Sequence, residues 1–415
     1  MEIVYGAGWD PSRQRLVGVL TADRARRRDR SGDQYSVLVV GGAGPRLLID
    51  VCWHRWYLAV WVFDPARRRT GKFDFRRLED ERVFLARTEG WRYADGHAEF
   101  DERAWHRTAD IDLDGRAYVE VRYAAEKGGS GSGGEQFDVD TLWRPAPAFG
   151  DWALLYELAA DGVDDEPVSA AMIESVVDRS TPASLAQPPW RPPSPLQAPD
   201  MTGWFSDGAR FEVPDGGNGT VRTRRVGPLR LPTGRLVAAE PGWSSDDFVA
   251  FSATMPPGRY PVTLASFEWD GPSGDWIGIA AARVEVLDEP IVTWELATRA
   301  GQDVRLLADD QFYGFGVDGG TGGLFDAQAA DLALIQRADE SFYAPLWDTG
   351  STELTDDSSD ANVIVFTSAV GDGTYPTWIG RTATGEIACF VVDMELLRDA
   401  RPLGPRTGRR PAAGG

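Results

Sequence analysis

The chain has very few cysteines and no long apolar run. Of its 415 residues only Cys52 and Cys389 are cysteine, and both lie within apolar segments. We therefore expect them to be small buried residues rather than a disulfide or a metal site. No segment approaches the roughly 20 apolar residues that cross a bilayer, and the start, Met-Glu-Ile-Val-Tyr-Gly, lacks the pattern of a secretory signal. These absences predict a cytoplasmic protein.

Histidine is scarce as well. His54, His97 and His106 all lie in the first half, without the spacing of zinc ligands, and the chain has no Gly-x-Ser-x-Gly elbow. A histidine-dependent nucleophilic mechanism confined to the second half is thus excluded. Two interpretations stay open for His97 and His106, which flank Glu99 and other acidic residues: a general acid–base group, or solvated positions in a loop. The sequence predicts no catalytic residue and no cofactor.

Lysine is nearly absent, and acidic residues outnumber basic ones. Only Lys72 and Lys127 are lysine among 43 basic residues, and the formal net charge is −21. Residues 201–395 hold 30 Asp and Glu against 12 Arg, a net charge of −18. Such a region repels nucleic-acid phosphates and anionic membranes and attracts a positively charged protein. We predict a basic protein partner and neither nucleic acid nor membrane; acidity that serves only solubility is the alternative.

Short apolar runs separated by turn residues indicate antiparallel β-structure in both halves. Residues 117–123, Ala-Tyr-Val-Glu-Val-Arg-Tyr, alternate so cleanly that one face should be buried and the other solvated. The chain is too long for one ordinary core, and seven prolines in residues 181–200 indicate an extended linker. The predicted fold is mainly β (α+β): two β-rich domains of antiparallel sheets with few helices at residues 1–180 and 201–397, joined by that linker, and a disordered tail at residues 398–415.

Three local patterns interrupt the strands. Residues 166–178 predict a helix with Pro167 in its first turn. Asp326 is expected to be the N-cap of a second helix over residues 327–335. Residues 127–134, Lys-Gly-Gly-Ser-Gly-Ser-Gly-Gly, predict a flexible loop, because no side chain in it can pack.

Four segments of the second half carry a resemblance to a known family. They read Pro-Gly-Arg-Tyr-Pro-Val-Thr-Leu at residues 257–264, Ala-Ala-Arg-Val-Glu-Val and Val-Thr-Trp-Glu-Leu-Ala at residues 281–286 and 292–297, Gly-Val-Asp-Gly-Gly-Thr-Gly-Gly at residues 316–323, and Gly-Asp-Gly-Thr-Tyr-Pro-Thr-Trp-Ile-Gly at residues 371–380. In this order, residues 201–397 resemble the bacterial family known as domain of unknown function 4241. The resemblance implies a β-rich domain and no established activity. Gly323 departs from the family, where a cysteine is expected in many relatives.

The first half is similar, more loosely, to immunity-type proteins of bacterial toxin systems. The similarity lies in runs rich in Trp, Asp and Arg, such as Trp-Asp-Pro at residues 9–11 and Phe-Gly-Asp-Trp at residues 149–152. It implies a protein-binding role without a catalytic site.

The glycine-rich stretches of the second half allow three interpretations. Val-Asp-Gly-Gly-Thr at residues 317–321 is similar to the first phosphate loop of sugar kinases and actin-like ATPases. Residues 201–397 contain no lysine, and Gly-Asp-Gly at residues 371–373 leads into an extended aromatic segment, so a turn between strands is favoured. Asp318, Asp326 and Asp372 remain candidate oxygen ligands for Ca²⁺ or Mg²⁺, although they do not follow EF-hand spacing.

These observations leave two main hypotheses for function. The first is a non-catalytic protein-binding module of bacterial toxin-immunity or defence type, whose acidic second domain binds a basic protein. The alternative is a metal- or nucleotide-dependent hydrolase that uses Asp318, Asp326 and Asp372. A structural role in a larger assembly cannot be separated from the first hypothesis by sequence.

Overall fold

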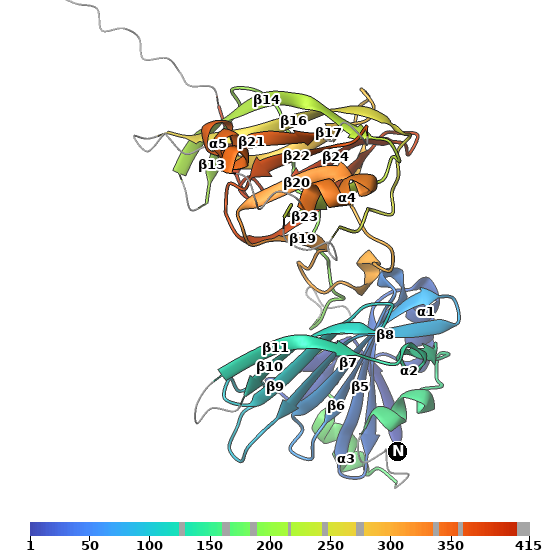
Figure 1. Cartoon of the computed structure of the whole chain (residues 1–415). Helices are drawn as coiled ribbons and strands as arrows, with labels where there is room; N and C mark the ends of the chain where they lie inside the picture. Colours follow the sequence, from blue (N-terminus) through green and yellow to red (C-terminus); the bar gives the residue numbers. More distant parts are fainter. Residues whose placement is uncertain are drawn as a thin grey trace, which may run out of the picture. The chain divides into compact units, whose positions relative to one another are not determined.

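The protein consists of two compact units (Figure 1). The computed structural model describes residues 1–123, 129–159, 167–182, 189–214, 217–242, 248–270, 278–334, 340–355 and 360–404. Unit 1 comprises Met1–Pro195 and Arg305–Asp309, and unit 2 comprises Leu196–Val304 and Asp310–Gly415. Both units are built from antiparallel sheets with few helices, which confirms the predicted fold class. Within the described ranges, no helix is long and apolar enough to span a membrane.

Unit 1 is built on one ten-stranded sheet, in which the strands from β4 to β11 each pair with the next along the chain. The order is β1-β4-β5-β6-β7-β8-β9-β10-β11, and β12 pairs with β8. Such local pairing follows from the short turns between the apolar runs. The strands are β1 (Glu2–Gly6), β4 (Tyr35–Gly41), β5 (Gly44–Cys52), β6 (Tyr57–Phe63), β7 (Arg69–Glu79), β8 (Arg82–Arg92), β9 (Trp105–Ile111), β10 (Arg116–Tyr123), β11 (Gly129–Gln136) and β12 (Trp143–Pro145).

Apolar clusters cover both faces of this sheet at its first strands. On one face, Val37 and Ile49 belong to a buried cluster with Ala25 of helix α1 (Ala22–Ser31) and Leu155 of the 3₁₀ helix η2 (Ala153–Leu158). On the other, Leu48 belongs to a cluster that includes residues of the hairpin β2 (Gly8–Asp10) and β3 (Arg15–Val17) and of helix α3 (Ala170–Val176). Adjacent residues of a strand point to opposite faces, so both layers come from the same strands. The remaining elements are η1 (Trp53–Arg55) and α2 (Val139–Leu142).

Most of the glycine–serine run forms strand β11, which corrects the prediction of a flexible loop for residues 129–134; residues 127 and 128 lie outside the described residues. Its eight residues pair with β10 in an unbroken antiparallel register, from Tyr123↔Gly129 to Arg116↔Gln136. The ring of Tyr123 lies beside Gly129 and Gly131. Backbone pairing and this ring supply contacts that glycine and serine side chains cannot make. The prediction for β10 is confirmed, since buried and exposed residues alternate along most of it.

The two predicted helices form with shifted boundaries. Helix α3 begins at Ala170, because the Ser169 hydroxyl accepts a hydrogen bond from the backbone N–H of Met172 at 3.2 Å and caps the helix there. Pro167 therefore precedes the helix, and Glu166 lies outside the described residues. Asp326 is an N-cap as predicted, followed by η5 (Ala327–Ala329) and α4 (Ala330–Leu334).

Part of the proline-rich segment lies against the sheet of unit 1. The indole N–H of Trp190 donates to Oγ of Ser36 at 2.8 Å, and its ring centroid lies 6.0 Å from that of Tyr57. Residues 183–188 of the predicted linker lie outside the described residues.

A short distant segment, Arg305–Asp309, also belongs to unit 1. Leu306 joins a buried cluster with Phe84 and Ala109. Its neighbour Arg305 accepts a hydrogen bond through its carbonyl from Nε of Arg76 at 2.6 Å, and Arg76 is only 2% exposed. The segment thus packs into unit 1, although more than a hundred residues of the chain separate it from the proline-rich residues that end the first part of this unit.

Unit 2 contains a nine-stranded sheet and a four-stranded sheet. The larger sheet has the order β18-β23-β24-β17-β16-β14-β13-β25, with β19 paired to β23, and the smaller has the order β15-β20-β22-β21. The strands are β13 (Arg210–Val213), β14 (Gly217–Leu231), β15 (Leu236–Ala239), β16 (Gly258–Trp269), β17 (Gly278–Glu285), β18 (Thr293–Leu296), β19 (Gly314–Val317), β20 (Thr321–Asp326), β21 (Ser351–Thr355), β22 (Asn362–Thr367), β23 (Gly373–Arg381), β24 (Ile387–Asp393) and β25 (Arg401–Leu403).

The two sheets of unit 2 share one core. Leu264 and Phe390 of the larger sheet belong to the same buried cluster as Leu324 and Phe366 of the smaller, which is the packing of a sandwich. The opposite face of the smaller sheet packs against α4 and α5 (Glu340–Thr349), in a second cluster that includes Leu346 (Figure 1). The 3₁₀ turn η4 (Val304–Leu306) lies where the chain passes from unit 2 to the inserted segment of unit 1.

Two smaller predictions can be compared with the structure. Cys52 and Cys389 are both free and buried, as predicted. Residues 401–403 form β25, paired with β13, which corrects the prediction of disorder for that part of residues 398–415; the backbone pairing orders it. Residues 405–415 lie outside the described residues.

Candidate functional site

Asp326, one of the three predicted carboxylates, is buried and hydrogen-bonded to the backbone around it. Its carboxylate accepts hydrogen bonds from the backbone N–H of Gln328 at 2.9 Å and of Thr233 at 2.9 Å, and from the Thr233 hydroxyl at 2.7 Å. The side chain is 0% exposed. With these three hydrogen bonds Asp326 caps the following helix and holds the turn at Thr233.

Asp318 and Asp372 are exposed and lie near each other in unit 2. They are adjacent to the paired residues Val317 and Gly373 of β19 and β23. Asp326 lies at the other end of β20, about 17 Å along that strand. The structure thus brings two of the three predicted carboxylates together and separates the third from them.

A third carboxylate, Glu240, completes this group. It accepts hydrogen bonds from the backbone N–H of Asp318 at 2.7 Å and of Gly319 at 2.6 Å, and it is 8% exposed. Burial raises the pKa of Glu240, and the negative charges of Asp318 and Asp372 act in the same direction, against the two backbone hydrogen bonds. We call Glu240, Asp318 and Asp372 the carboxylate group.

The carboxylate group explains the glycine-rich stretch at residues 316–323. The stretch joins β19 to β20, so it is a turn between strands and not a strand-to-helix phosphate loop. The amides that would face a phosphate are bound to Glu240 instead. Gly320 has φ +70°, a left-handed conformation that favours glycine. Sequence reasoning missed Glu240 because it lies 78 residues before Asp318 and has no motif around it.

Glu240 and Asp326 bind backbone N–H groups at turns, whereas Asp318 and Asp372 are exposed. Among the residues in the described ranges, no group of three or more His, Cys, Asp or Glu side chains has the arrangement of a metal site. The exposed oxygens of Asp318 and Asp372 can accept hydrogen bonds from a cationic group of a partner.

Unit 1 contains a second concentration of charge, on one face of its sheet. Asp50 is 4% exposed and accepts hydrogen bonds from Oγ of Ser36 at 2.5 Å and from Nε1 of Trp61 at 3.1 Å. Burial raises the pKa of Asp50 to about 6, although these donors and the cations Arg69 and Lys72 oppose the rise. A carboxylate in this position is costly to ionise.

Neighbouring strands continue the charged face. Lys72 of β7 pairs with Asp74 at 3.0 Å and with Glu89 at 3.5 Å, and Arg87 pairs with Asp110 at 2.6 Å. Burial alone would raise the pKa of Glu89, but His106, Lys72 and Arg87 together lower it to about 2. We call these residues, with Asp50 and His106, the charged face of unit 1.

The histidines predicted as a possible acid–base group are placed apart. His106 lies in β9, not in a loop, with Nε2 3.6 Å from the Glu89 carboxylate and its ring stacked on Trp91 at 4.7 Å. His97 lies in the loop before β9, where Nδ1 accepts from the backbone N–H of Ala94 at 3.2 Å. Glu99 instead pairs with Arg69 at 2.9 Å.

Comparison with known proteins gives a match, most of which lies in unit 2. A family model described as "Protein of unknown function (DUF4241)" matches residues 229–392. This confirms the resemblance found in the sequence for that part of the chain. No curated protein and no solved structure matches the chain.

Proposed function

We propose that the chain is a non-catalytic, cytoplasmic protein-binding module, of bacterial toxin-immunity or defence type, whose unit 2 binds a basic protein. The observation that carries the proposal is the carboxylate group. Glu240, Asp318 and Asp372 lie together, and no cation of the described residues forms an ion pair with them. A lysine or arginine of a partner placed between Asp318 and Asp372 would satisfy their exposed oxygens.

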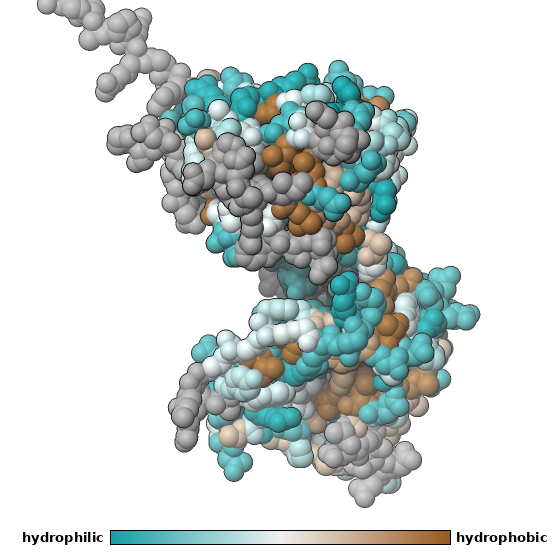
Figure 2. Space-filling view, in the orientation of Figure 1, coloured by the Kyte–Doolittle hydropathy of each residue, from teal (hydrophilic) through white to brown (hydrophobic). Residues whose placement is uncertain are grey.

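The distribution of ion pairs supports the proposal. Eight arginines of unit 2 pair with its own carboxylates: Arg210, Arg222, Arg225, Arg230, Arg259, Arg283, Arg381 and Arg398. Exposed carboxylates are left over without such partners among the described residues, for example Asp318, Asp331 and Asp372. Hydrophilic residues lie along the edges of the visible face of this unit, around a central hydrophobic patch (Figure 2). The excess negative charge would accelerate encounter with a positively charged protein.

The test is retention of a partner from native lysate by the tagged full-length chain. We expect one specific basic protein to be retained at low ionic strength and released at about 0.5 M salt, where the Debye length is only about 4 Å. The variant Asp318→Asn/Asp372→Asn should lose the partner. The control variant Asp288→Asn/Glu289→Gln removes the same charge from exposed residues elsewhere in unit 2 and should keep it.

Three results would count against the proposal or narrow it. If no specific protein is retained at low salt, the proposal fails. Equal losses in both variants would show that net charge, and not the carboxylate group, attracts the partner. The hydrolase alternative predicts instead that Mg²⁺, Ca²⁺ or ATP raises the melting temperature and that Asp372→Ala abolishes the rise; a protein-binding module should give no shift.

A further inference from the structure

Helix α1 carries a dense group of arginines in this acidic chain. The helix runs over Ala22–Ser31, and its sequence contains five arginines in ten residues. The Thr21 hydroxyl accepts from the backbone N–H of Arg24 at 3.3 Å and caps the start, and Gly32 ends the helix with φ +76°. Both ends of the helix are therefore fixed.

The helix is also anchored to the sheet through an acidic residue. Oδ1 of Asp29 accepts hydrogen bonds from the Tyr35 hydroxyl at 2.8 Å and from Nε1 of Trp53 at 2.8 Å. Ala25 on the same helix is fully buried. Oδ1 of Asp29 is thus bound by neutral donors of strand β4 and of η1, and not by an arginine of its own helix.

Three of the arginines have no partner among the described residues. Arg24, Arg27 and Arg30 are exposed, and no described carboxylate lies within ion-pair distance of their guanidinium groups. In contrast, Arg26 lies 3.9 Å from Asp23, and Arg28 donates to the backbone carbonyl of Gln34 at 3.0 Å. Guanidinium groups left unpaired on a rigid helix are available to an external anion.

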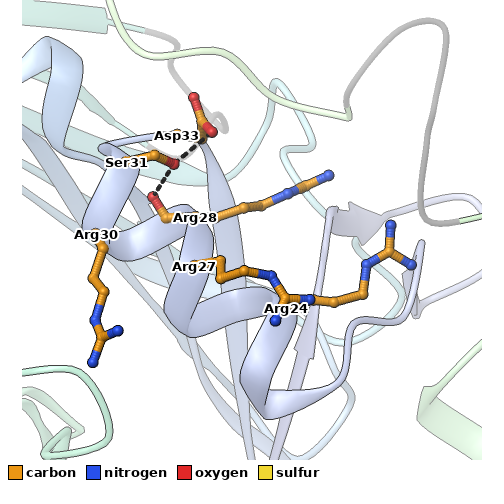
Figure 3. A pocket seen from close by; sticks show the side chains of 6 residues that line it. All are labelled: Arg24, Arg27, Arg28, Arg30, Ser31 and Asp33. Atoms are coloured by element: carbon orange, nitrogen blue, oxygen red, sulfur yellow. Dashed lines mark hydrogen bonds between the residues drawn. The ribbon is translucent and has the colours of Figure 1, made fainter.

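Arg24, Arg27, Arg28 and Arg30 line an open hollow of about 550 Å³ (Figure 3). Residues 24, 27, 28 and 31 follow one face of the helix, since residues three and four apart are neighbours. Figure 3 shows Arg24, Arg27 and Arg28 extending on the same side of the helix and Arg30 on another. Ser31 and Asp33 complete the lining, joined by a hydrogen bond of 2.6 Å. We call this hollow the arginine hollow.

We propose that the arginine hollow binds a phosphoryl group. A phosphoryl group offers three acceptor oxygens and close to two negative charges, so several guanidinium groups can converge on it, whereas one carboxylate is filled by a single guanidinium fork. Arg24 and Arg27 lie one turn apart and can reach the same anion. The group could be carried by a phosphorylated protein segment or by a free phosphate ester, which share this chemistry.

Nucleic acid and anionic membrane are disfavoured as ligands by the surroundings. The ten residues of α1 span about 15 Å, while the whole chain has a net charge of −21. A long polyanion would extend beyond the hollow into that negative field. The helix also presents no exposed aromatic or large apolar residue that could stack on bases or enter a bilayer.

The test measures phosphate binding by calorimetry on the full-length chain, in about 50 mM salt, where electrostatic binding is weakly screened. The probes are inorganic phosphate, a short phosphoserine peptide and its unphosphorylated form. We expect phosphorylated probes to bind and Arg24→Gln/Arg27→Gln to weaken the binding by at least about tenfold, as loss of one charge-assisted hydrogen bond does. Arg222→Gln/Arg225→Gln, which removes the same charge from exposed arginines of unit 2, should bind normally.

The outcomes separate the possible sources and can overturn the proposal. Tighter binding of the phosphoserine peptide than of inorganic phosphate assigns the group to a protein, and the reverse assigns it to a free ester. The proposal fails if no phosphorylated probe binds, if both double variants weaken binding equally, or if a DNA oligonucleotide or anionic vesicles bind better than the phosphorylated probes. If Arg24→Gln/Arg27→Gln does not fold, the variant Arg24→Lys/Arg27→Lys replaces it. This variant keeps the positive charge but loses the paired N–H donors of the guanidinium groups, and it should still weaken binding.

Discussion

The two units use the same antiparallel architecture but handle buried charge differently. Unit 1 holds 33 acidic and 27 basic residues, and unit 2 holds 31 and 16. In unit 1, partly buried side chains pair with each other across strands, as Lys72 of β7 does with Glu89 of β8. In unit 2, the buried carboxylates Glu240 and Asp326 accept mainly from backbone N–H groups at turns. Buried charges thus form ion pairs on the sheet of unit 1, whereas in unit 2 the carboxylates Glu240 and Asp326 hold turns.

This difference has a consequence for how each unit responds to change. Cross-strand ion pairs are sensitive to pH and to the loss of one partner. The sandwich core of unit 2 is apolar, so its stability depends on packing and on a few turn hydrogen bonds. Four measurements test the contrast, from the largest expected effect to the smallest.

The largest effect is expected from a cavity in the core of unit 2. Phe390 is fully buried and stacks on Phe251 with ring centroids 6.0 Å apart. Phe390→Ala should lower the free energy of unfolding by about 3–5 kcal/mol, measured by urea denaturation. The exposed Val292, 60% accessible, provides the control, and Val292→Ala should change little. A cost below about 1 kcal/mol for Phe390→Ala would mean that the sandwich core is not tightly packed.

A pH-dependent effect is expected in unit 1. The pKa of Asp50 is raised to about 6 by burial, so the folded state binds more protons than the unfolded state between about pH 4 and 6. The contribution of Asp50 to stability should therefore fall as pH rises through this window, by about 3 kcal/mol. Asp50→Asn should remove this slope in urea unfolding series. The control Asp23→Asn, at a carboxylate 81% exposed, should retain it; an unchanged slope in Asp50→Asn would contradict the assignment.

A smaller effect is expected at Gly323, a close-packed position of unit 2. A Cβ atom at Gly323 would lie 2.3 Å from Cγ of Pro241. A larger side chain cannot enter here unless Pro241 moves, so Gly323→Cys should cost about 1–3 kcal/mol in urea unfolding. Gly316→Ala is the matched control, because a Cβ there meets no atom within 4 Å. If Gly323→Cys is neutral, Pro241 can shift without cost.

The smallest effect is expected from a surface ion pair of unit 2. Arg222 and Glu268 pair at 2.8 Å, with side chains 50% and 58% exposed. Solvent screens such a pair, so Arg222→Ala should cost less than about 0.5 kcal/mol. A double-mutant cycle with Glu268→Ala measures the coupling directly. A coupling above about 1 kcal/mol would show that surface charge matters to unit 2 as much as buried charge matters to unit 1.

The sequence predicted correctly those elements that depend on residues close together in the chain. The alternation in residues 117–123 gave β10, and the preference of aspartate for N-caps gave Asp326 its place. It failed at β11, because the strand depends on pairing with β10 and not on its own glycines and serines.

The candidate sites were less predictable because their residues are distant in the chain. Glu240 reaches Asp318 only through the pairing of β15 with β20. One signal for the charged face of unit 1 was present. Lys72 and Asp74 alternate in β7 as Arg87 and Glu89 do in β8, and charges of opposite sign at a spacing of two indicate pairing across strands.

The segment Arg305–Asp309 lies inside the region that the family model matches but belongs to the other compact unit. The family model matches residues 229–392, which include this segment, yet the segment folds with unit 1, where Leu306 is buried beside Phe84. An expression clone that cut the gene at the borders of this match would therefore divide unit 1 and separate Arg76 from the carbonyl of Arg305. The matched region and the compact units therefore have different boundaries, and a truncated chain should be designed on the boundaries of the units.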